Sequence, residues 1–387
     1  MLPLNESRRA VASARGFLAI VSIVGVLNAA TAFAQEPPVQ EVTTQAAPSI
    51  EKTSTLDFIA APFPVVNPTI GNGGAGVAAL IYKIDADSPP SSTGVGGFYS
   101  DTKSWAAGVA QTTYLSNDLI HANGSLFYYD LHYKFFGIGA AAGSRGRSVS
   151  IEQSGVGIIP ELLVRVWPHT YLGLGYRYLT AKTGIDAQAE SSIVGTTIPG
   201  SQLDLTTSSL GPVVEYDSRD DRFWPTTGTF ARVIAAFSNR AVLGSGSNYR
   251  TFTAAYNGYV PIGEKQVLAY RASVCGASNG TPFFDLCSYG SNSDLRGYVS
   301  GQYIDKRMFS AQLEYRWRFY WRFGMTVFAG VGGVAPEFNK FEFDKLLPAA
   351  GLGIRFLASE ENHVNIGLDF AVGKRSSALY FRIGEAF

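Results

Sequence analysis

The sequence has 387 residues, in which 31 Lys and Arg balance 31 Asp and Glu and only 16% of the residues are charged. This balance argues against a nucleic-acid-binding protein, because such proteins need a basic excess to neutralise phosphates. The 42 Gly, 25 Phe and 20 Tyr suit strands that end in aromatic girdles. Beyond residue 35 no apolar run reaches about 18 residues, which excludes a bundle of membrane-spanning helices.

Residues 1–34 are predicted to form a secretory signal peptide. Three arginines precede an apolar segment over residues 16–30, and Ala32-Phe33-Ala34 supplies a small-residue cleavage site before Gln35. The alternative is a membrane anchor, which is disfavoured because the apolar segment is short and a polar segment follows it. The sequence therefore directs the chain to the cell envelope.

Residues 35–70 are rich in Pro, Ala, Thr and Gln and show no periodicity. This composition predicts a flexible periplasmic lead-in. Within it, residues 58–66 suit either a short plug or a turn, and the sequence does not decide between the two. The strand pattern described next is predicted to occupy residues 71–387.

Apolar and polar residues alternate along many later segments. From Phe309 to Phe319 every second residue is apolar, and the residues between them include Glu314, Arg316 and Arg318. Because successive side chains of a strand point to opposite faces, such a strand has one apolar and one charged face. The pattern recurs with no helical segment able to cover the apolar face. It predicts an all-β fold, a transmembrane antiparallel β-barrel with lipid outside and a polar lumen.

The number of strands follows from the pattern and from parity. About fifteen segments alternate, and a barrel with both ends in the periplasm needs an even number of strands. Short connections alternate with long ones, as expected for periplasmic turns and outer loops. Counted from the N-terminus, the alternation of short and long connections breaks down between Asp118 and Arg147. We therefore expect a missing strand near residues 133–139. We therefore predict about sixteen strands, with about fourteen as the alternative.

Cys275 and Cys287 are the two cysteines of the chain and flank a Gly-, Ser- and Asn-rich segment. In an oxidising compartment, a disulfide that closes this segment is favoured over two free thiols. A metal site is disfavoured because no Cys-x-x-Cys accompanies them and the histidines show no ligand spacing. The scattered histidines also give no sign of an enzyme, so we expect no catalytic site and no cofactor.

The longest predicted loop contains Arg296-Gly297-Tyr298, just before the strand that carries Glu314. The loop is long enough to fold back into the lumen, where a desolvated Arg296 needs a carboxylate partner. A bidentate pair would then fix the loop, and Glu314, on the lumen face of its strand, is the predicted partner. The alternative is a solvated loop arginine.

Asp217, Arg219 and Asp220 precede Pro225 and Gly228 in a short connection. Proline and glycine favour a turn, and the charged side chains can hydrogen-bond local backbone. This motif is therefore predicted to be structural rather than chemical.

The last predicted strand, residues 378–387, places Phe381, Ile383 and Phe387 on one face. Glu385 stands where another apolar residue is expected, so the end of the strand is an imperfect apolar edge. Its pairing with the first strand is expected to be weak.

These motifs together resemble those of the BamA/TamA-type outer-membrane assembly family, the bacterial surface antigens, over residues 71–387. The resemblance implies that the Arg296 motif and Glu314 fix an inward loop, that the Asp217 motif is a periplasmic turn, and that Phe387 ends a C-terminal sorting signal. It also implies a seam between first and last strands that can open. Family members carry a second acid on the next strand, where this chain has Gly330, and Asp369 is the predicted substitute.

The resemblance implies a protein of the bacterial outer membrane that assists insertion or translocation of proteins or lipids. Expected partners are outer-membrane lipid, lipopolysaccharide and client outer-membrane or secreted proteins. The lead-in leaves no room for the POTRA domains of the family, so we expect a barrel-only member, with a separate periplasmic partner as the alternative source of that function. Two other hypotheses remain: a passive pore with an anion bias from lumen arginines such as Arg316 and Arg355, and a plugged structural surface protein.

Overall fold

The computed structural model describes residues 57–67, 69–85, 88–185, 198, 200–222, 224–290, 294–359, 363–374 and 376–387. The predicted signal peptide and residues 35–56 of the predicted lead-in lie outside these ranges. In the described part of the chain, no helix is long and apolar enough to cross a membrane.

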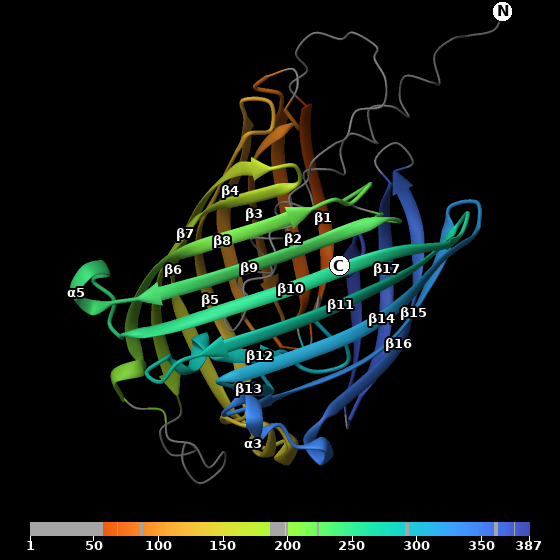
Figure 1. The fold of residues 1–387 in the computed structure, drawn as a ribbon. Coiled ribbons are helices and arrows are strands. Elements are labelled where there is room, and N and C mark those ends of the chain that lie inside the picture. The colour runs from red at the N-terminus through yellow and green to blue at the C-terminus, as the bar shows by residue number, and fades with distance from the viewer. Residues whose placement is uncertain are drawn as a thin grey trace, which may run out of the picture.

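Sixteen antiparallel strands follow one another around a nearly closed barrel, which confirms the predicted fold and strand number (Figure 1). Each strand pairs with the next one of the barrel in chain order. The strands of the first half are β1 (Asp57–Asn67), β2 (Gly71–Tyr82), β3 (Ser91–Ser100), β4 (Trp105–Leu115), β5 (Ile120–Phe135), β6 (Val149–Trp167), β7 (Thr170–Ile185) and β8 (Asp204–Asp217). Those of the second half are β9 (Gly228–Ser238), β10 (Tyr249–Gly263), β11 (Gln266–Ala277), β14 (Arg307–Tyr320), β15 (Phe323–Ala335), β16 (Leu347–Ser359), β17 (Val364–Gly373) and β18 (Ser376–Ile383).

The sixteenth strand is not where the sequence pattern predicted it. β1 lies at residues 57–67, within the predicted lead-in, and pairs along its whole length with β2. Residues 133–139 instead contain the end of β5 and the start of a loop with helix α3 (Ala140–Arg145). The barrel therefore begins before residue 71. The predicted alternation of short and long connections breaks down because the predicted strands do not include β1. Pro62 and Pro64 obscure β1 in the sequence, because proline is accommodated only in edge strands and at bulges.

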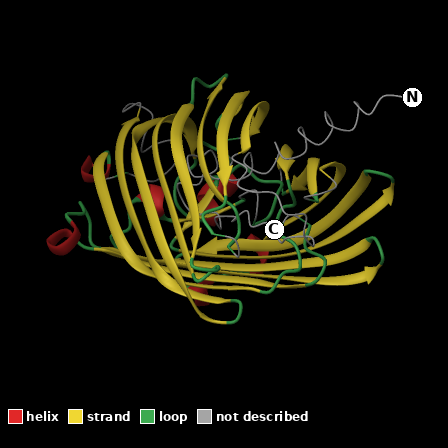
Figure 2. Ribbon diagram, turned by 90° about the horizontal axis from the view of Figure 1, so that it is seen from above, coloured by secondary structure: helices red, strands yellow, loops and turns green. Residues whose placement is uncertain are grey.

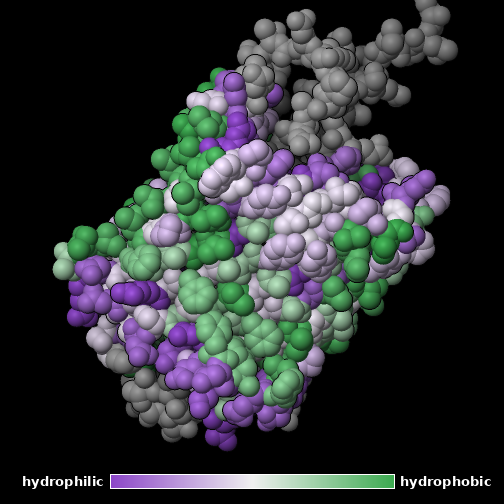
Figure 3. All heavy atoms as spheres, in the orientation of Figure 1, coloured by the Kyte–Doolittle hydropathy of each residue, from purple (hydrophilic) through white to green (hydrophobic). Residues whose placement is uncertain are grey.

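The barrel has an apolar outer face and a polar lumen. On β14, Leu313 is 56% exposed, whereas the next residue, Glu314, is fully buried. The predicted alternation is thus confirmed, and Figure 3 shows hydrophobic residues spread over the middle of the outer wall. Connections such as 321–322 are short at one end, here called the turn rim. The connections at the opposite end, the loop rim, are mostly longer and carry α3, α5 (Arg240–Leu243) and short 3-10 turns.

The loop between β11 and β14, residues 278–306, folds into the barrel and is called the motif loop. It contains β12 (Cys287–Tyr289) and β13 (Tyr303–Asp305), which pair as a separate two-stranded sheet. Figure 2 shows loop segments inside the ring of strands. Leu295 and Tyr298 of this loop are fully buried, and a disulfide joins Cys275 of β11 to Cys287. The structure thus brings together the two cysteines that the sequence paired.

Candidate functional site

Arg296 is the centre of a buried ion cluster in the lumen. Its side chain is 0% exposed and contacts Glu314 of β14 on one side and Asp369 of β17 on the other, where Nη1 lies 2.5 Å from Oδ2. The guanidinium carbon lies 3.4 Å from the centre of the Phe328 ring, so a cation–π contact covers its flat face. The structure brings together both acids that the sequence proposed for Arg296.

Gly330 leaves no room for the acid that stands on this strand in the family pattern. A Cβ atom built on Gly330 would lie 2.4 Å from the carbonyl oxygen of Ala311 and 2.8 Å from the side chain of Leu295. Leu295 belongs to the motif loop itself. The β14 backbone, together with the loop side chain, therefore favours glycine at this position, and Asp369 supplies the second carboxylate from β17.

The backbone of the motif also contacts β18. Gly297 has a φ of +115°, which favours glycine, and its N–H donates to the Tyr380 hydroxyl oxygen at 2.9 Å. The carbonyl oxygen of Gly297 accepts a hydrogen bond from the Ser376 hydroxyl. The Tyr298 hydroxyl donates to the carbonyl oxygen of Pro348 at 2.6 Å and accepts from the N–H of Lys374 at 2.9 Å. The motif thus connects the loop to the last three strands.

Further arginines complete the cluster. Arg316 lies 2.7 Å from Glu314, and Asp369 is contacted by Arg355 at 2.5 Å and by Arg382 at 2.7 Å. Buried charges need such partners, because an unpaired charge removed from water is strongly destabilising. Arg316 and Arg355 therefore belong to an ion-pair network at this level of the lumen. We call the group the Arg296 cluster; its members are Arg296, Arg316, Arg355, Arg382, Glu314, Asp369 and Glu385.

The end of the chain departs from the prediction. β18 ends at Ile383, Gly384 has a φ of +80°, and Phe387 is buried in the lumen rather than placed on the outward face with Phe381. The cause is Glu385, whose carboxylate lies 2.9 Å from Nε of Arg355. This ion pair draws residues 385–387 inward, where Arg316 donates to the carbonyl oxygen of Phe387 at 2.7 Å. The sorting role of Phe381, Ile383 and Phe387 stays a prediction.

Sequence reasoning missed Glu385 and Arg382 as members of the cluster. The signal for Glu385 was present, because this acid interrupts the apolar face of the last predicted strand. Arg382 alternates correctly with Phe381, but nothing in the sequence connects it with Asp369. That contact depends on the register of β17 with β18. In this register Asp369 lies opposite Tyr380, and Arg382 follows Tyr380 two residues later on the same face of β18.

The predicted turn motif is built from local hydrogen bonds. Asp217 accepts two hydrogen bonds at 2.8 Å from the Arg219 guanidinium. Asp220 Oδ1 accepts from the backbone N–H groups of Thr226 and Thr227, and the buried Pro225 lies in the same bend. Gly228 has a φ of +91°, and a Cβ there would lie 2.1 Å from a backbone oxygen. These contacts support a structural role for the motif.

This turn also reaches distant strands, which the sequence did not indicate. We call its residues, 218–227, the crossing turn. The Trp224 ring lies 4.8 Å from the guanidinium carbon of Arg318 on β14, and Asp221 lies 2.8 Å from His363, in the connection between β16 and β17. The hydrogen bond that His363 donates to Asp221 raises the pKa of His363 above its ordinary value, although partial burial opposes the shift. The crossing turn therefore extends across the turn rim of the barrel.

Comparisons with known proteins agree with this architecture. The profile of the Omp85 superfamily domain matches residues 100–387. The fold is similar to BamA from Haemophilus ducreyi lacking POTRA domains 1–3, with a TM-score of 0.56 and 16% identity over 94% of this chain and 77% of that one. It is also similar to CdiB from Acinetobacter baumannii, with a TM-score of 0.55 and 13% identity, over 86% of this chain and 60% of that one. For CdiB from Escherichia coli the TM-score is 0.53 with 14% identity, over 87% and 63%. No curated protein matches the sequence at a significant level.

Proposed function

The chain belongs to the Omp85 superfamily, whose barrels reside in the bacterial outer membrane, and from this premise we propose that it assists insertion or translocation of proteins or lipids at that membrane. Its proposed partners are outer-membrane lipid, lipopolysaccharide, client outer-membrane or secreted proteins, and a separate periplasmic protein. We propose a non-enzymatic role, in which the barrel acts on clients through its strands.

The observation that carries the proposal is the unpaired seam. β1 and β18 are in contact, but no hydrogen-bonded ladder joins them within the described residues. A strand edge in lipid carries backbone groups that need partners. Such an edge can accept a client strand by β-augmentation, in which main-chain hydrogen bonds supply the affinity. Pro62 and Pro64 further weaken β1 as a closing partner, because each lacks a backbone N–H.

The Arg296 cluster provides a control on that seam. The motif loop contacts β18 through Tyr380 and Ser376, and Arg382 of β18 pairs with Asp369. A loop fixed in this way holds the last strand and its inward end in one position. We therefore propose that the motif loop sets the geometry of the β18 edge at which a client strand pairs.

The passive-pore hypothesis has less support. Arg316 and Arg355, proposed as its anion-attracting groups, are buried and paired with Glu314, Asp369 and Glu385. Paired arginines in a lumen occupied by a folded loop offer no free charge to a passing anion. A plugged structural protein would share this geometry, so only a functional assay separates it from an assembly barrel.

The test uses the full chain in liposomes and follows the folding rate of an unfolded client barrel, with conductance recorded on the same preparation. We expect faster client folding that is lost with Arg296→Ala, and no steady conductance. Unaccelerated folding with a steady, anion-biased conductance would overturn the proposal in favour of the pore. Observing neither faster client folding nor conductance would overturn the proposal in favour of the structural protein.

A further inference from the structure

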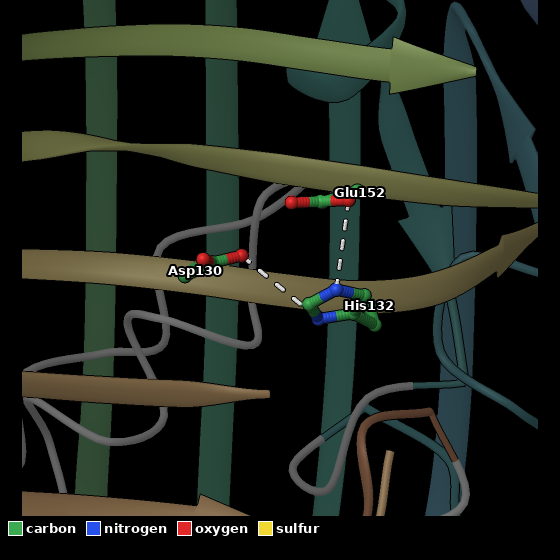
Figure 4. Close-up of side chains that lie close together, drawn as sticks. All are labelled: Asp130, His132 and Glu152. Carbon is green, nitrogen blue, oxygen red and sulfur yellow. Dashed lines mark ion pairs between the residues drawn. The ribbon is translucent and has the colours of Figure 1, made fainter. Parts of the chain in front are cut away.

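Three potential metal ligands meet on the outward side of β5 and β6, strands that carry no member of the Arg296 cluster (Figure 4). His132 of β5 lies directly opposite Glu152 of β6, and Asp130 lies two residues before His132 on the same face. His132 Nε2 is 3.7 Å from Glu152 Oε2, and His132 Nδ1 is 3.9 Å from Asp130 Oδ1. One donor atom from each residue falls within 4.8 Å of the others. Two paired strands thus hold the three side chains close together.

Two of the atoms in this group lack hydrogen-bond partners. Asp130 Oδ1 and His132 Nδ1 are shielded from solvent, and neither has a partner among the described residues. Their separation of 3.9 Å is too long for a hydrogen bond. Buried polar atoms are nearly always satisfied in proteins, so this gap calls for an explanation. A cation between imidazole and carboxylates would satisfy both atoms.

The surroundings keep the group in contact with water. On the same face, Lys134 and Ser150 lie towards the loop rim and Lys182 of β7 lies opposite Ser154, and all three are exposed. On the other side, Trp105 faces Asp130 across the strand pair, and its ring stacks on Tyr128 at 5.2 Å. An aromatic pair of this kind marks the boundary between the apolar band and the polar rim. The three ligands therefore stand at the polar edge of the outer wall.

We propose that Asp130, His132 and Glu152 bind a divalent transition-metal ion of the Zn²⁺ type. One imidazole nitrogen with two carboxylates is a ligand set that Zn²⁺, Cu²⁺ and Ni²⁺ accept, whereas Mg²⁺ and Ca²⁺ prefer oxygen alone. Three protein ligands leave a coordination position open to water. The ion bridges β5 and β6, so it adds a cross-strand connection at the loop rim. This metal site is independent of the proposed assembly function.

The first test measures Zn²⁺ binding to the full chain in detergent micelles by calorimetry. We expect one site, weakened by at least about tenfold in both His132→Asn and Glu152→Gln, since each removes a ligand. The Glu152 side chain is 62% exposed, so its replacement by Gln leaves the fold intact. His169→Asn, at an exposed histidine of the turn rim, is the matched control and keeps wild-type affinity. No binding by the wild-type chain, or equal binding by all variants, would overturn the proposal.

A second readout locates the ion. Because Trp105 faces Asp130, Cu²⁺ bound at the site quenches Trp105 fluorescence, and the quenching is lost with His132→Asn or with Trp105→Phe. Zn²⁺ should also raise the unfolding temperature of the wild-type chain but not that of His132→Asn, because binding to the folded state alone stabilises it. Quenching or stabilisation that persists in His132→Asn would contradict this assignment.

Discussion

Arg232 and Arg296 are both buried arginines with two carboxylate partners, yet they connect different parts of the barrel. Arg232 of β9 contacts Glu215 of β8 and Glu161 of β6, so these two partners lie in strands of the wall. Arg296 comes from the motif loop and contacts strands β14 and β17. The same charge pairing therefore stabilises the wall in one region and fixes a loop in the other. The difference predicts that similar losses of stability have different structural consequences.

The largest expected effects come from truncating these two arginines. Arg296→Ala and Arg232→Ala each leave two buried carboxylates without this partner, which costs about 3–5 kcal/mol of unfolding free energy. Urea unfolding of each variant in micelles measures this loss. The variants should differ in protease sensitivity, because only Arg296→Ala releases the motif loop. If residues 278–306 are equally protected from protease in both variants, Arg296 does not fix the motif loop in the way proposed.

Loss of the disulfide should have the next largest effect. Replacing Cys275 and Cys287 together by Ser should lower the unfolding free energy by about 2–4 kcal/mol, because the bond restricts the unfolded chain. Arg296 still fixes the loop in this variant, so the loop should stay protected from protease. A reductant should lower the urea midpoint of the wild-type chain and leave the double variant unchanged. A wild-type chain that is insensitive to the reductant would contradict the prediction.

Restoring the acid of the family pattern should weaken the cluster. Gly330→Asp forces a Cβ against the backbone of Ala311 and the side chain of Leu295, and such overpacking costs about 1–3 kcal/mol. Gly124→Ala on β5 is the control, because a Cβ there meets no atom within 4 Å. Urea midpoints of the two variants check this. A Gly330→Asp chain as stable as the wild type would show that β14 and the motif loop can shift to accommodate the side chain.

The smallest expected effect concerns pH at the crossing turn. The pKa of His363 is raised by its hydrogen bond to Asp221, with Asp220 acting in the same direction and Arg318 opposing. The contact is therefore fully present below the ordinary histidine pKa of about 6.5, and it is lost as the pH rises through the raised value. NMR titration of the imidazole should give a lower pKa in Asp221→Asn, which keeps an acceptor for the backbone N–H of Trp224. An unchanged pKa of His363 would show that Asp221 of the crossing turn does not interact with the connection between β16 and β17.

The sequence predicted much of this fold because strand alternation is a local signal. Leu313, Glu314 and Arg316 fall on the faces that their alternation assigned. β1 was missed because Pro62 and Pro64 are atypical of strands, and only its position at the edge of the sheet tolerates them. Which strand stands at an edge depends on the pairing of the whole sheet, which no local pattern contains.

The site was predicted in part for a similar reason. Arg296 and Glu314 are predictable because a desolvated arginine needs an acid, and Asp369 because it faces the lumen. The inward path of residues 385–387 depends on Arg355, which is 30 positions away in the chain from Glu385. The group of Asp130, His132 and Glu152 was also missed, because its members meet only through the register of β5 with β6. Register and long-range pairing are decided by the whole barrel, so these contacts required the structure.

The most direct test of the central claim is hydrogen exchange of β18, residues 376–383, compared with that of β9 in the same samples. If the motif loop holds the last strand, Arg296→Ala should increase exchange in β18 and leave β9 protected. Arg232→Ala should increase exchange in β9 and leave β18 as in the wild type. If exchange in β18 does not change in Arg296→Ala, or changes equally in both variants, the loop does not control the seam.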